Sequence, residues 1–148
     1  MRHELLVFDA YGTLFDVAAA SRMAATRPDA GRLAEVWPKL AEDWRRKQLE
    51  YTWLRTIMGA YADFSTVTAD ALDWALEQHR LTDPALRQRL LDLYQDLPAY
   101  PEVSAVLANL RASGYRLAIL SNGTPAMLAS ATRAAGIDTL IEAALSVD

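Results

Sequence analysis

The sequence predicts an α/β fold, a doubly wound parallel sheet with an inserted helical cap. Short apolar runs typical of buried parallel strands occur at residues 5–8 and 115–120, with a weaker third candidate at 141–147. About a hundred residues with helical spacing separate the first two runs. Of the 148 residues, 52% are hydrophobic and 23% are charged, a balance typical of a globular chain.

The inserted segment is expected to begin with an amphipathic helix. Apolar residues recur every three or four positions from Leu33 to Trp44. Pro38 lies inside this stretch, so we expect the helix to break there or a new helix to start. A second apolar face continues from Trp44 to Gly59 and Ala60. Its members are Tyr51, Leu54, Met58 and Tyr61.

Two more helices are expected before the sequence returns to the sheet. Thr68 is the expected N-cap of the first. Asp83 and Pro84 supply the N-cap and the first residue of the second. Residues 98–101 are typical of a linker.

The second strand is expected to lie between two helices. The first of these begins at Pro101 and ends with Gly114 at its C′ position, and the other starts near Pro125. Residues 1–14 and 99–148 would then form the core, and residues 15–98 a helical cap. An insertion directly after the first strand suggests a lid over the carboxyl edge of the sheet, where such folds place their sites.

Composition excludes several classes of function. Nineteen acidic and fifteen basic residues give a net charge of −4, which argues against a nucleic-acid partner. Cysteine is absent, which excludes disulfides, thiolate metal sites and cysteine catalysis, and two histidines argue against a histidine-rich zinc site. No apolar run reaches the roughly 18 residues of a membrane span, and no signal peptide is recognised, so a cytoplasmic location is expected.

Polar residues follow two of the predicted strands. Asp9 comes directly after the first strand, and Thr13 is close enough in sequence to hydrogen-bond its carboxylate. Ser121, Asn122 and Gly123 follow the second strand and precede a helix, where hydroxyl, amide and backbone N–H groups can bind an anion. Taken singly, these motifs are also common as turns or caps. At the ends of two neighbouring strands, they favour a functional site.

These two motifs resemble those of a known superfamily. Residues 9–14 and 120–123 resemble the first two motifs of the haloacid dehalogenase superfamily. Residues 44–55 are similar to a stretch that marks the L-2-haloacid dehalogenases of type II, and residues 9–17 indicate the same subfamily. The resemblance runs from the first strand to the end of the sequence. It implies the superfamily's Rossmann-like core with a helical cap.

The resemblance also implies a reaction: hydrolytic dehalogenation of short L-2-haloalkanoic acids to 2-hydroxy acids, with inversion at C2. Asp9 would be the nucleophile that forms an aspartyl ester, and Thr13 would hold its carboxylate. Arg45 would stabilise the departing halide, with Asn122 assisting. Ser121 would bind the substrate carboxylate. The remaining residues implied to contact the substrate are Ala10, Tyr11, Leu49 and Phe64.

A small-molecule phosphatase of the same superfamily is the alternative enzyme. Such phosphatases place a second aspartate two residues after the nucleophile, as general acid, and bind Mg²⁺. Tyr11 occupies that position here. Halide leaves without being protonated, so a dehalogenase needs no such acid. We therefore expect neither a metal ion nor a cofactor.

Other interpretations remain open for several residues. Arg45 could be a solvated arginine beside Arg46, Lys47 and Arg55, and Leu49 and Phe64 could be ordinary core residues. The chain could also be a non-catalytic remnant that associates through a cap face. That face would consist of Trp44, Tyr51, Trp53 and Tyr61.

The family pattern continues beyond this sequence. In the family, a catalytic lysine and a later strand end bearing serine, asparagine and aspartate follow the third strand, whereas this sequence stops at Asp148. Lys39 and Lys47 lie in the cap and are not assumed to replace that lysine. We therefore expect a truncated dehalogenase, with residues 5–8 as an edge strand and little or no turnover. The complete enzyme is expected to be a homodimer.

Overall fold

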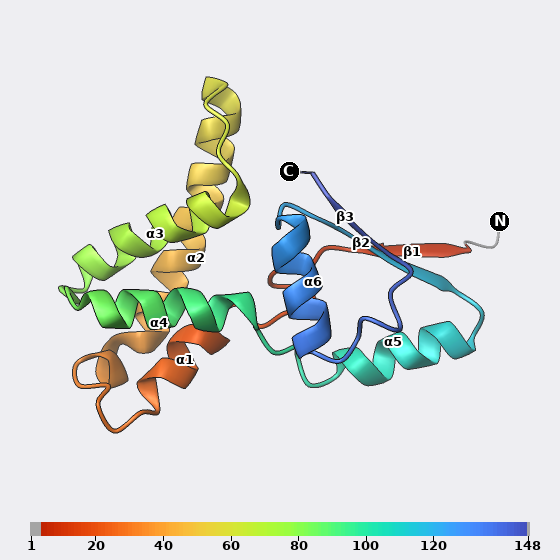
Figure 1. Cartoon of the computed structure of the whole chain (residues 1–148), viewed down its shortest axis with the longest axis horizontal. Helices are drawn as coiled ribbons and strands as arrows, with labels where there is room; N and C mark the ends of the chain where they lie inside the picture. Colours follow the sequence, from red (N-terminus) through yellow and green to blue (C-terminus); the bar gives the residue numbers. More distant parts are fainter. Residues whose placement is uncertain (1–3, 148) are drawn as a thin grey trace. The chain divides into compact units, whose positions relative to one another are not determined.

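The computed structural model describes residues 4–147 and confirms the α/β class (Figure 1). The predicted order of strand, helical insertion, linker, helix, strand, helix and strand is also confirmed. The elements are β1 (Leu5–Phe8), α1 (Ala19–Ala25), α2 (Leu33–Met58), α3 (Phe64–Gln78), α4 (Pro84–Gln95), α5 (Val103–Ala112), β2 (Arg116–Ser121), α6 (Pro125–Ala134) and β3 (Ala143–Ser146).

The three strands form one parallel sheet in the order β1-β2-β3. Phe8 of β1 pairs with Ile119 of β2, and Ser121 of β2 pairs with Ser146 of β3, so all three strands end at the same edge of the sheet. β2 is the central strand, and its residues Leu117 and Ile119 are fully buried.

The expectation that residues 5–8 form a buried strand was wrong. Leu5 is 43% exposed and Val7 is 53% exposed. Within residues 4–147, β1 pairs with β2 along one side and forms an edge of the sheet, as expected for the sequence as given. The apolar side chains of β1 therefore lack the cover that an inner strand receives from both sides.

The chain divides into two compact units, which are described separately. Unit 1 contains Met1–Asp16 with Gln95–Asp148, and unit 2 contains Val17–Tyr94. From the sequence, these boundaries are expected after residues 14 and 98. In unit 1, α5 packs on β2 and α6 packs on β3.

Local signals predicted most of the helix ends in unit 1. Gly114 follows α5 with a φ of 88°, as the C′ position requires. α6 starts at Pro125, and the side chain of Thr124 caps it by accepting a hydrogen bond from the Met127 N–H. α5 begins at Val103, two residues after the expected Pro101, which lies in a turn.

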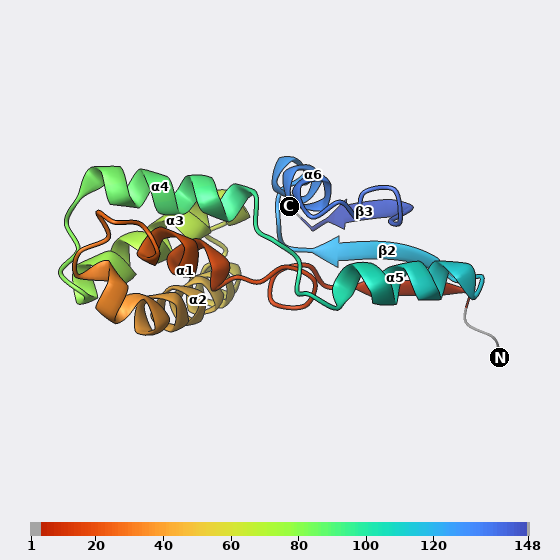
Figure 2. The same ribbon diagram turned by 90° about the horizontal axis from the view of Figure 1, so that it is seen from below.

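Unit 2 is a bundle in which α2 packs against α1 and α3 (Figure 2). The expected break at Pro38 was wrong, because α2 continues through it from Leu33 to Met58. Pro38 lies in the second turn, so its missing N–H removes one early hydrogen bond. Buried residues that follow it, including Leu40 and Trp44, pack in the bundle and keep the helix continuous.

Thr68 does not cap a helix, so this prediction was also wrong. α3 begins at Phe64, and Asp63 is its N-cap, accepting a hydrogen bond of 2.7 Å from the Thr66 N–H. Thr68 lies inside α3, where its hydroxyl donates to the carbonyl of Phe64. The prediction for α4 was confirmed, because it begins at Pro84 with the Asp83 carboxylate accepting from the Ala85 N–H.

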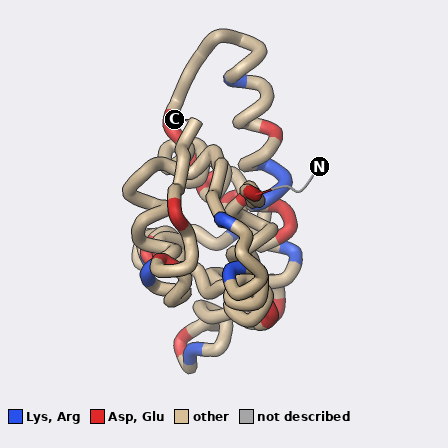
Figure 3. The backbone as a smooth tube through the Cα atoms, turned by 90° about the vertical axis from the view of Figure 1, so that its right-hand side faces the viewer, with Lys and Arg blue, Asp and Glu red and all other residues tan. Residues whose placement is uncertain are grey.

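Charges of both signs are interspersed along the backbone (Figure 3). Several pairs lie within one helix, such as Lys39 with Glu42 and Lys47 with Glu50. Within residues 4–147, no helix is long and apolar enough to cross a membrane.

Candidate active site

Asp9 directly follows β1, and its exposed carboxylate accepts a hydrogen bond of 3.0 Å from the Thr13 hydroxyl. A tight turn brings these two residues together. The carbonyl of Ala10 accepts hydrogen bonds from the backbone N–H groups of Thr13, Leu14 and Phe15. Gly12 has a φ of 89° in this turn, a conformation that residues with side chains rarely adopt. The expected link between Thr13 and Asp9 is therefore present.

Two residues between Asp9 and Gly12 in this loop are buried. Ala10 is fully buried and Tyr11 is 2% exposed. The ring of Tyr11 lies 5.9 Å from that of Phe15, with the two rings tilted by 55°. The residue two positions after Asp9 is thus a buried aromatic side chain.

The loop after β2 contacts the loop after β1. A methyl group placed on Gly123 would lie 2.6 Å from Cε2 of Tyr11, so Tyr11 packs directly over this glycine. Ser121 is buried, and its Oγ accepts a hydrogen bond of 3.2 Å from the Gly123 N–H. Asn122, between them, is exposed. The structure therefore brings the two motifs together at the carboxyl edge of the sheet.

Arg45 lies on α2 in unit 2 and is partly buried. Its Nη1 donates a hydrogen bond of 2.8 Å to Oε1 of Gln48, which is 1% exposed. This environment differs from that of a solvated arginine on a helix face. The neighbouring cations pair with acids: Arg46 with Asp43, Lys47 with Glu50 and Arg55 with Asp70.

The other two expected contact residues also lie in unit 2. Leu49 is partly buried on α2, and Phe64 is 5% exposed as the first residue of α3. The expected residues are thus divided between the units. Unit 1 holds Asp9, Ala10, Tyr11, Thr13, Ser121 and Asn122, and unit 2 holds Arg45, Leu49 and Phe64.

The buried polar residues around Arg45 were not expected from the sequence. Gln48 Nε2 donates to the Thr68 hydroxyl at 2.6 Å and to the Tyr94 hydroxyl at 3.2 Å. The indole N–H of Trp44 donates to the carbonyl of Thr68. No spacing rule reveals this network, because its members come from three helices.

A second cluster in unit 2 surrounds Asp43. His79 Nε2 lies 3.0 Å from one carboxylate oxygen of Asp43, and Arg46 donates to the other at 2.9 Å. Burial alone would raise the pKa of Asp43. The hydrogen bonds from Arg46 and His79, with the charge of Lys39, outweigh burial and hold the pKa below its ordinary value of 3.8.

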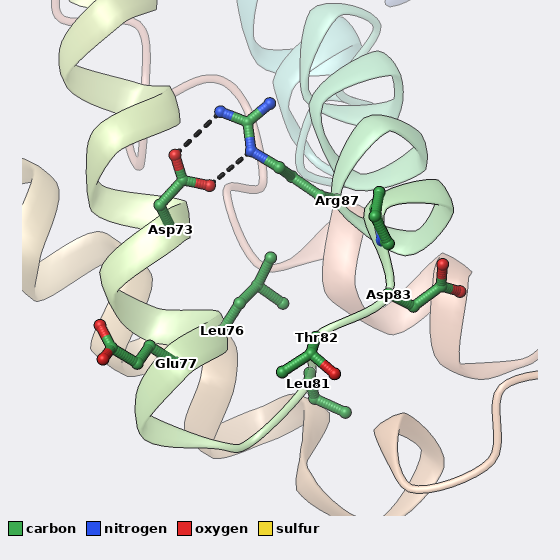
Figure 4. A pocket seen from close by; sticks show the side chains of 8 residues that line it. Asp73, Leu76, Glu77, Leu81, Thr82, Asp83 and Arg87 are labelled. Atoms are coloured by element: carbon green, nitrogen blue, oxygen red, sulfur yellow. Dashed lines mark hydrogen bonds and ion pairs between the residues drawn. The ribbon is translucent and has the colours of Figure 1, made fainter.

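A hollow of about 270 Å³ lies elsewhere in unit 2, between α3 and the start of α4 (Figure 4). Arg87 donates from Nε and Nη2 to both carboxylate oxygens of Asp73 at its rim. None of the expected site residues lines it. Its lining residues are Asp73, Leu76, Glu77, Leu81, Thr82, Asp83, Pro84 and Arg87.

Comparison with known proteins adds independent information. The sequence is 48% identical over 143 residues to (S)-2-haloacid dehalogenase 1 of Pseudomonas sp. strain CBS-3, covering 96% of this chain and 61% of that protein. It is 42% identical over 144 residues to the (S)-2-haloacid dehalogenase of Xanthobacter autotrophicus, covering 97% and 54%. The chain thus spans about 60% of the length of these curated relatives or less.

Solved structures show the same similarity. The crystal structure of a dehalogenase superposes with a TM-score of 0.87 at 41% identity, covering 99% of this chain and 62% of that one. The L-2-haloacid dehalogenase of Xanthobacter autotrophicus with chloropropionic acid covalently bound gives 0.83 at 38% identity, covering 99% and 58%. A family profile described as haloacid dehalogenase-like hydrolase matches residues 3–148. The chain therefore belongs to the haloacid dehalogenase-like hydrolases.

Proposed function

We propose that this chain carries the alkylating half of an L-2-haloacid dehalogenase site. The complete reaction is hydrolysis of short L-2-haloalkanoic acids to 2-hydroxy acids with inversion at C2. One observation carries the proposal: Asp9 is held by Thr13 at the carboxyl edge of the sheet, with buried Tyr11 where a phosphatase needs a second acid. The similarity to (S)-2-haloacid dehalogenases supports it.

In the first step, an oxygen of the Asp9 carboxylate attacks C2 of the substrate. A bond forms between this oxygen and C2, the carbon–halogen bond breaks, and halide leaves with the bonding electrons. C2 inverts in this displacement. Water then attacks the ester carbonyl and the bond between this carbonyl carbon and the C2 oxygen breaks. The 2-hydroxy acid leaves with its C2–O bond intact and one proton from water on that oxygen, the other proton is released, and the Asp9 carboxylate is restored.

The other residues bind the charges at the two ends of the substrate. Arg45 stabilises the departing halide, assisted by Asn122, because a planar guanidinium can direct two N–H donors at one anion. Ser121 and nearby backbone N–H groups bind the substrate carboxylate. The apolar contacts come from Ala10, Tyr11, Leu49 and Phe64. Within this division of roles, residues 1–14 with 99–148 form the core and residues 15–98 the cap.

The second step needs a group that activates water. Lys39 is paired with Glu42, and Lys47 is paired with Glu50 and lies 4.2 Å from the ring centroid of Trp74. These contacts support the proposal that neither lysine activates water. The ester on Asp9 should therefore accumulate in this 148-residue chain.

Trapping of that ester tests the proposal. Incubation with excess L-2-chloropropionate should add the mass of the dehalogenated acyl group to the peptide that contains Asp9, and release one chloride per adduct. The D enantiomer and Asp9→Asn provide the controls. Labelling should persist in EDTA, whereas absence of labelling, or Mg²⁺-dependent release of phosphate from a generic ester, would refute the assignment.

We further propose that two copies associate through the C-terminal half of α2. Its large apolar side chains recur at helical spacing and are exposed: Trp53 by 64%, Leu54 by 45%, Ile57 by 81% and Met58 by 74%. Trp44 is buried and does not belong to this surface, contrary to the sequence expectation. Sedimentation should show a dimer that Ile57→Glu dissociates and exposed Glu77→Gln does not. A cytoplasmic location stays a prediction of the sequence.

A further inference from the structure

A buried chain of hydrogen bonds leads from the Arg45 guanidinium to the backbone of α3. Arg45 Nη1 donates to Gln48 Oε1 at 2.8 Å, and Gln48 Nε2 donates to Thr68 Oγ1 at 2.6 Å. The Thr68 hydroxyl donates in turn to the carbonyl of Phe64 at 2.6 Å. Gln48 is 1% exposed and Thr68 is 2% exposed, so these bonds are shielded from water.

The donors and acceptors fix the orientation of the Gln48 amide. A guanidinium can only donate, so the amide oxygen faces Arg45. The single hydroxyl proton of Thr68 is directed to the Phe64 carbonyl, so Thr68 must accept from the amide nitrogen. The Tyr94 hydroxyl lies within 3.3 Å of both amide atoms. Rotating the amide by 180° would place an N–H against the guanidinium and break the chain.

We propose that Gln48 is a positioning residue that orients the Arg45 guanidinium, with the Phe64 carbonyl as its anchor. This inference rests on the proposed function, in which Arg45 stabilises the departing halide. An arginine side chain has several rotatable bonds, and orienting it before the reaction avoids ordering it while charge develops. The anchor lies at the first residue of α3, so the same chain ties Arg45 to Phe64, which is proposed to contact the substrate.

The neutral amide suits this role better than a carboxylate. Glutamate at position 48 would also accept from Arg45, but its negative charge would offset the positive charge that the halide needs. Gln48→Glu should therefore keep the guanidinium ordered and still slow alkylation. Gln48→Met, of similar shape and apolar, removes this acceptor and should leave the guanidinium less ordered.

A double-mutant cycle tests whether Gln48 acts through Arg45. The rate of Asp9 labelling by L-2-chloropropionate is measured by mass spectrometry for wild type, Gln48→Met, Arg45→Ala and the double variant. Gln48→Met should slow labelling by about 10- to 100-fold, the range expected from losing a hydrogen bond to a charged group. In the Arg45→Ala background, it should slow labelling by less than about twofold, because the interaction is already absent. Equal slowing in both backgrounds would overturn the inference.

Matched variants separate positioning from folding. Gln88→Met makes the same change at an exposed glutamine on α4 and should leave labelling unchanged. If circular dichroism shows that Gln48→Met is not folded, Thr68→Val replaces it, because it removes the acceptor for Gln48 Nε2. The cycle is then repeated with that variant.

A measurement that does not depend on activity separates this inference from the proposed function. NMR of ¹⁵N-arginine-labelled protein should resolve slowly rotating Nη–H groups for Arg45, assigned by their loss in Arg45→Lys. Gln48→Met should abolish these signals and Gln48→Glu should retain them. If wild type shows the ordered signals but no Asp9 labelling, the positioning stands and the dehalogenase proposal fails. If wild type labels but the signals survive in Gln48→Met, the positioning fails.

Discussion

The contact between the two strand-end loops predicts a large effect from adding one methyl group. In Gly123→Ala, the new Cβ would lie 2.6 Å from Tyr11 Cε2 and 3.2 Å from Leu128 Cδ2. Carbon atoms pack at about 3.5–4.0 Å, so the Tyr11 ring must move by roughly 1 Å. The ring is 2% exposed and lies against Phe15, which leaves little room for this movement.

This overpacking should lower both stability and alkylation rate. Forcing a methyl group into a packed core costs about 1–3 kcal/mol, which corresponds to a fall in Tm of roughly 2–12 °C for a chain of this size. A displacement of about 1 Å next to the proposed nucleophile can cost roughly 100-fold in rate. Labelling of Asp9 by L-2-chloropropionate should therefore slow by about 10- to 100-fold, as measured by mass spectrometry, while thermal unfolding reports the stability.

Gly114→Ala is the matched control. Gly114 has a φ of 88° and open space around its Cα, so alanine there strains the backbone without touching Tyr11. It should lower Tm and leave the labelling rate of the folded protein unchanged. Tyr11→Leu removes the ring atoms that clash, so the stability losses of Gly123→Ala and Tyr11→Leu should be less than additive. A Gly123→Ala variant with wild-type Tm and labelling rate would refute the argument.

Four further predictions concern other parts of the chain. Arg45→Lys should slow Asp9 labelling by about 10²–10³-fold, because lysine lacks the planar pair of donors. Tm should not fall, and an unchanged labelling rate would contradict the role of Arg45. The Asp43 pKa is depressed, so its stabilisation is complete above about pH 5 and is lost as pH falls through the folded pKa. Urea unfolding should show Asp43→Asn less stable by about 2 kcal/mol at pH 7, with a smaller difference at acid pH. Ser21 is fully buried, and its hydroxyl has no hydrogen-bond partner among residues 4–147. Ser21→Ala should therefore raise the free energy of unfolding by about 1 kcal/mol. The same change at exposed Ser104 should not raise it. The exposed edge strand β1 is expected to pair with other chains and cause aggregation, so Val7→Lys should lower light scattering, and unchanged scattering would contradict this role.

The sheet and its loops were predictable from sequence because their signals are local. Apolar runs, followed by Asp9 and by Ser121, place two strand ends at one edge of a parallel sheet, and the structure has that order. Gly114 follows the end of α5 and Pro125 begins α6, as expected. Each of these features depends on a few consecutive residues.

The errors came where distant contacts override a local signal. Pro38 indicates a helix break, but the burial of Leu40 and Trp44 in the bundle keeps α2 continuous. Thr68 is a good capping residue, yet a threonine inside a helix can also donate to the carbonyl four residues earlier, as it does here. Asp63 is the actual N-cap of α3, and as an aspartate it was the competing candidate for this position.

The candidate site was predictable in part for the same reason. The hydrogen bond between Thr13 and Asp9 spans four residues and follows from the turn. The network around Gln48 joins residues 20 and 46 positions apart, and no periodicity in the sequence reveals it.

The part of α2 between Arg45 and Ile57 is an unbroken helix that contains no proline or glycine, so it acts as a rigid rod. Arg45 and Ile57 lie on the same uninterrupted rod, roughly 18 Å apart along its axis at 1.5 Å per residue. A tilt of about 5° about either residue would move the other by roughly 1.5 Å, which is comparable to half a hydrogen-bond length. A partner that binds the C-terminal turns of α2 would thus change the orientation of the Arg45 guanidinium. By reciprocity, halide held at Arg45 would alter how firmly that partner is held.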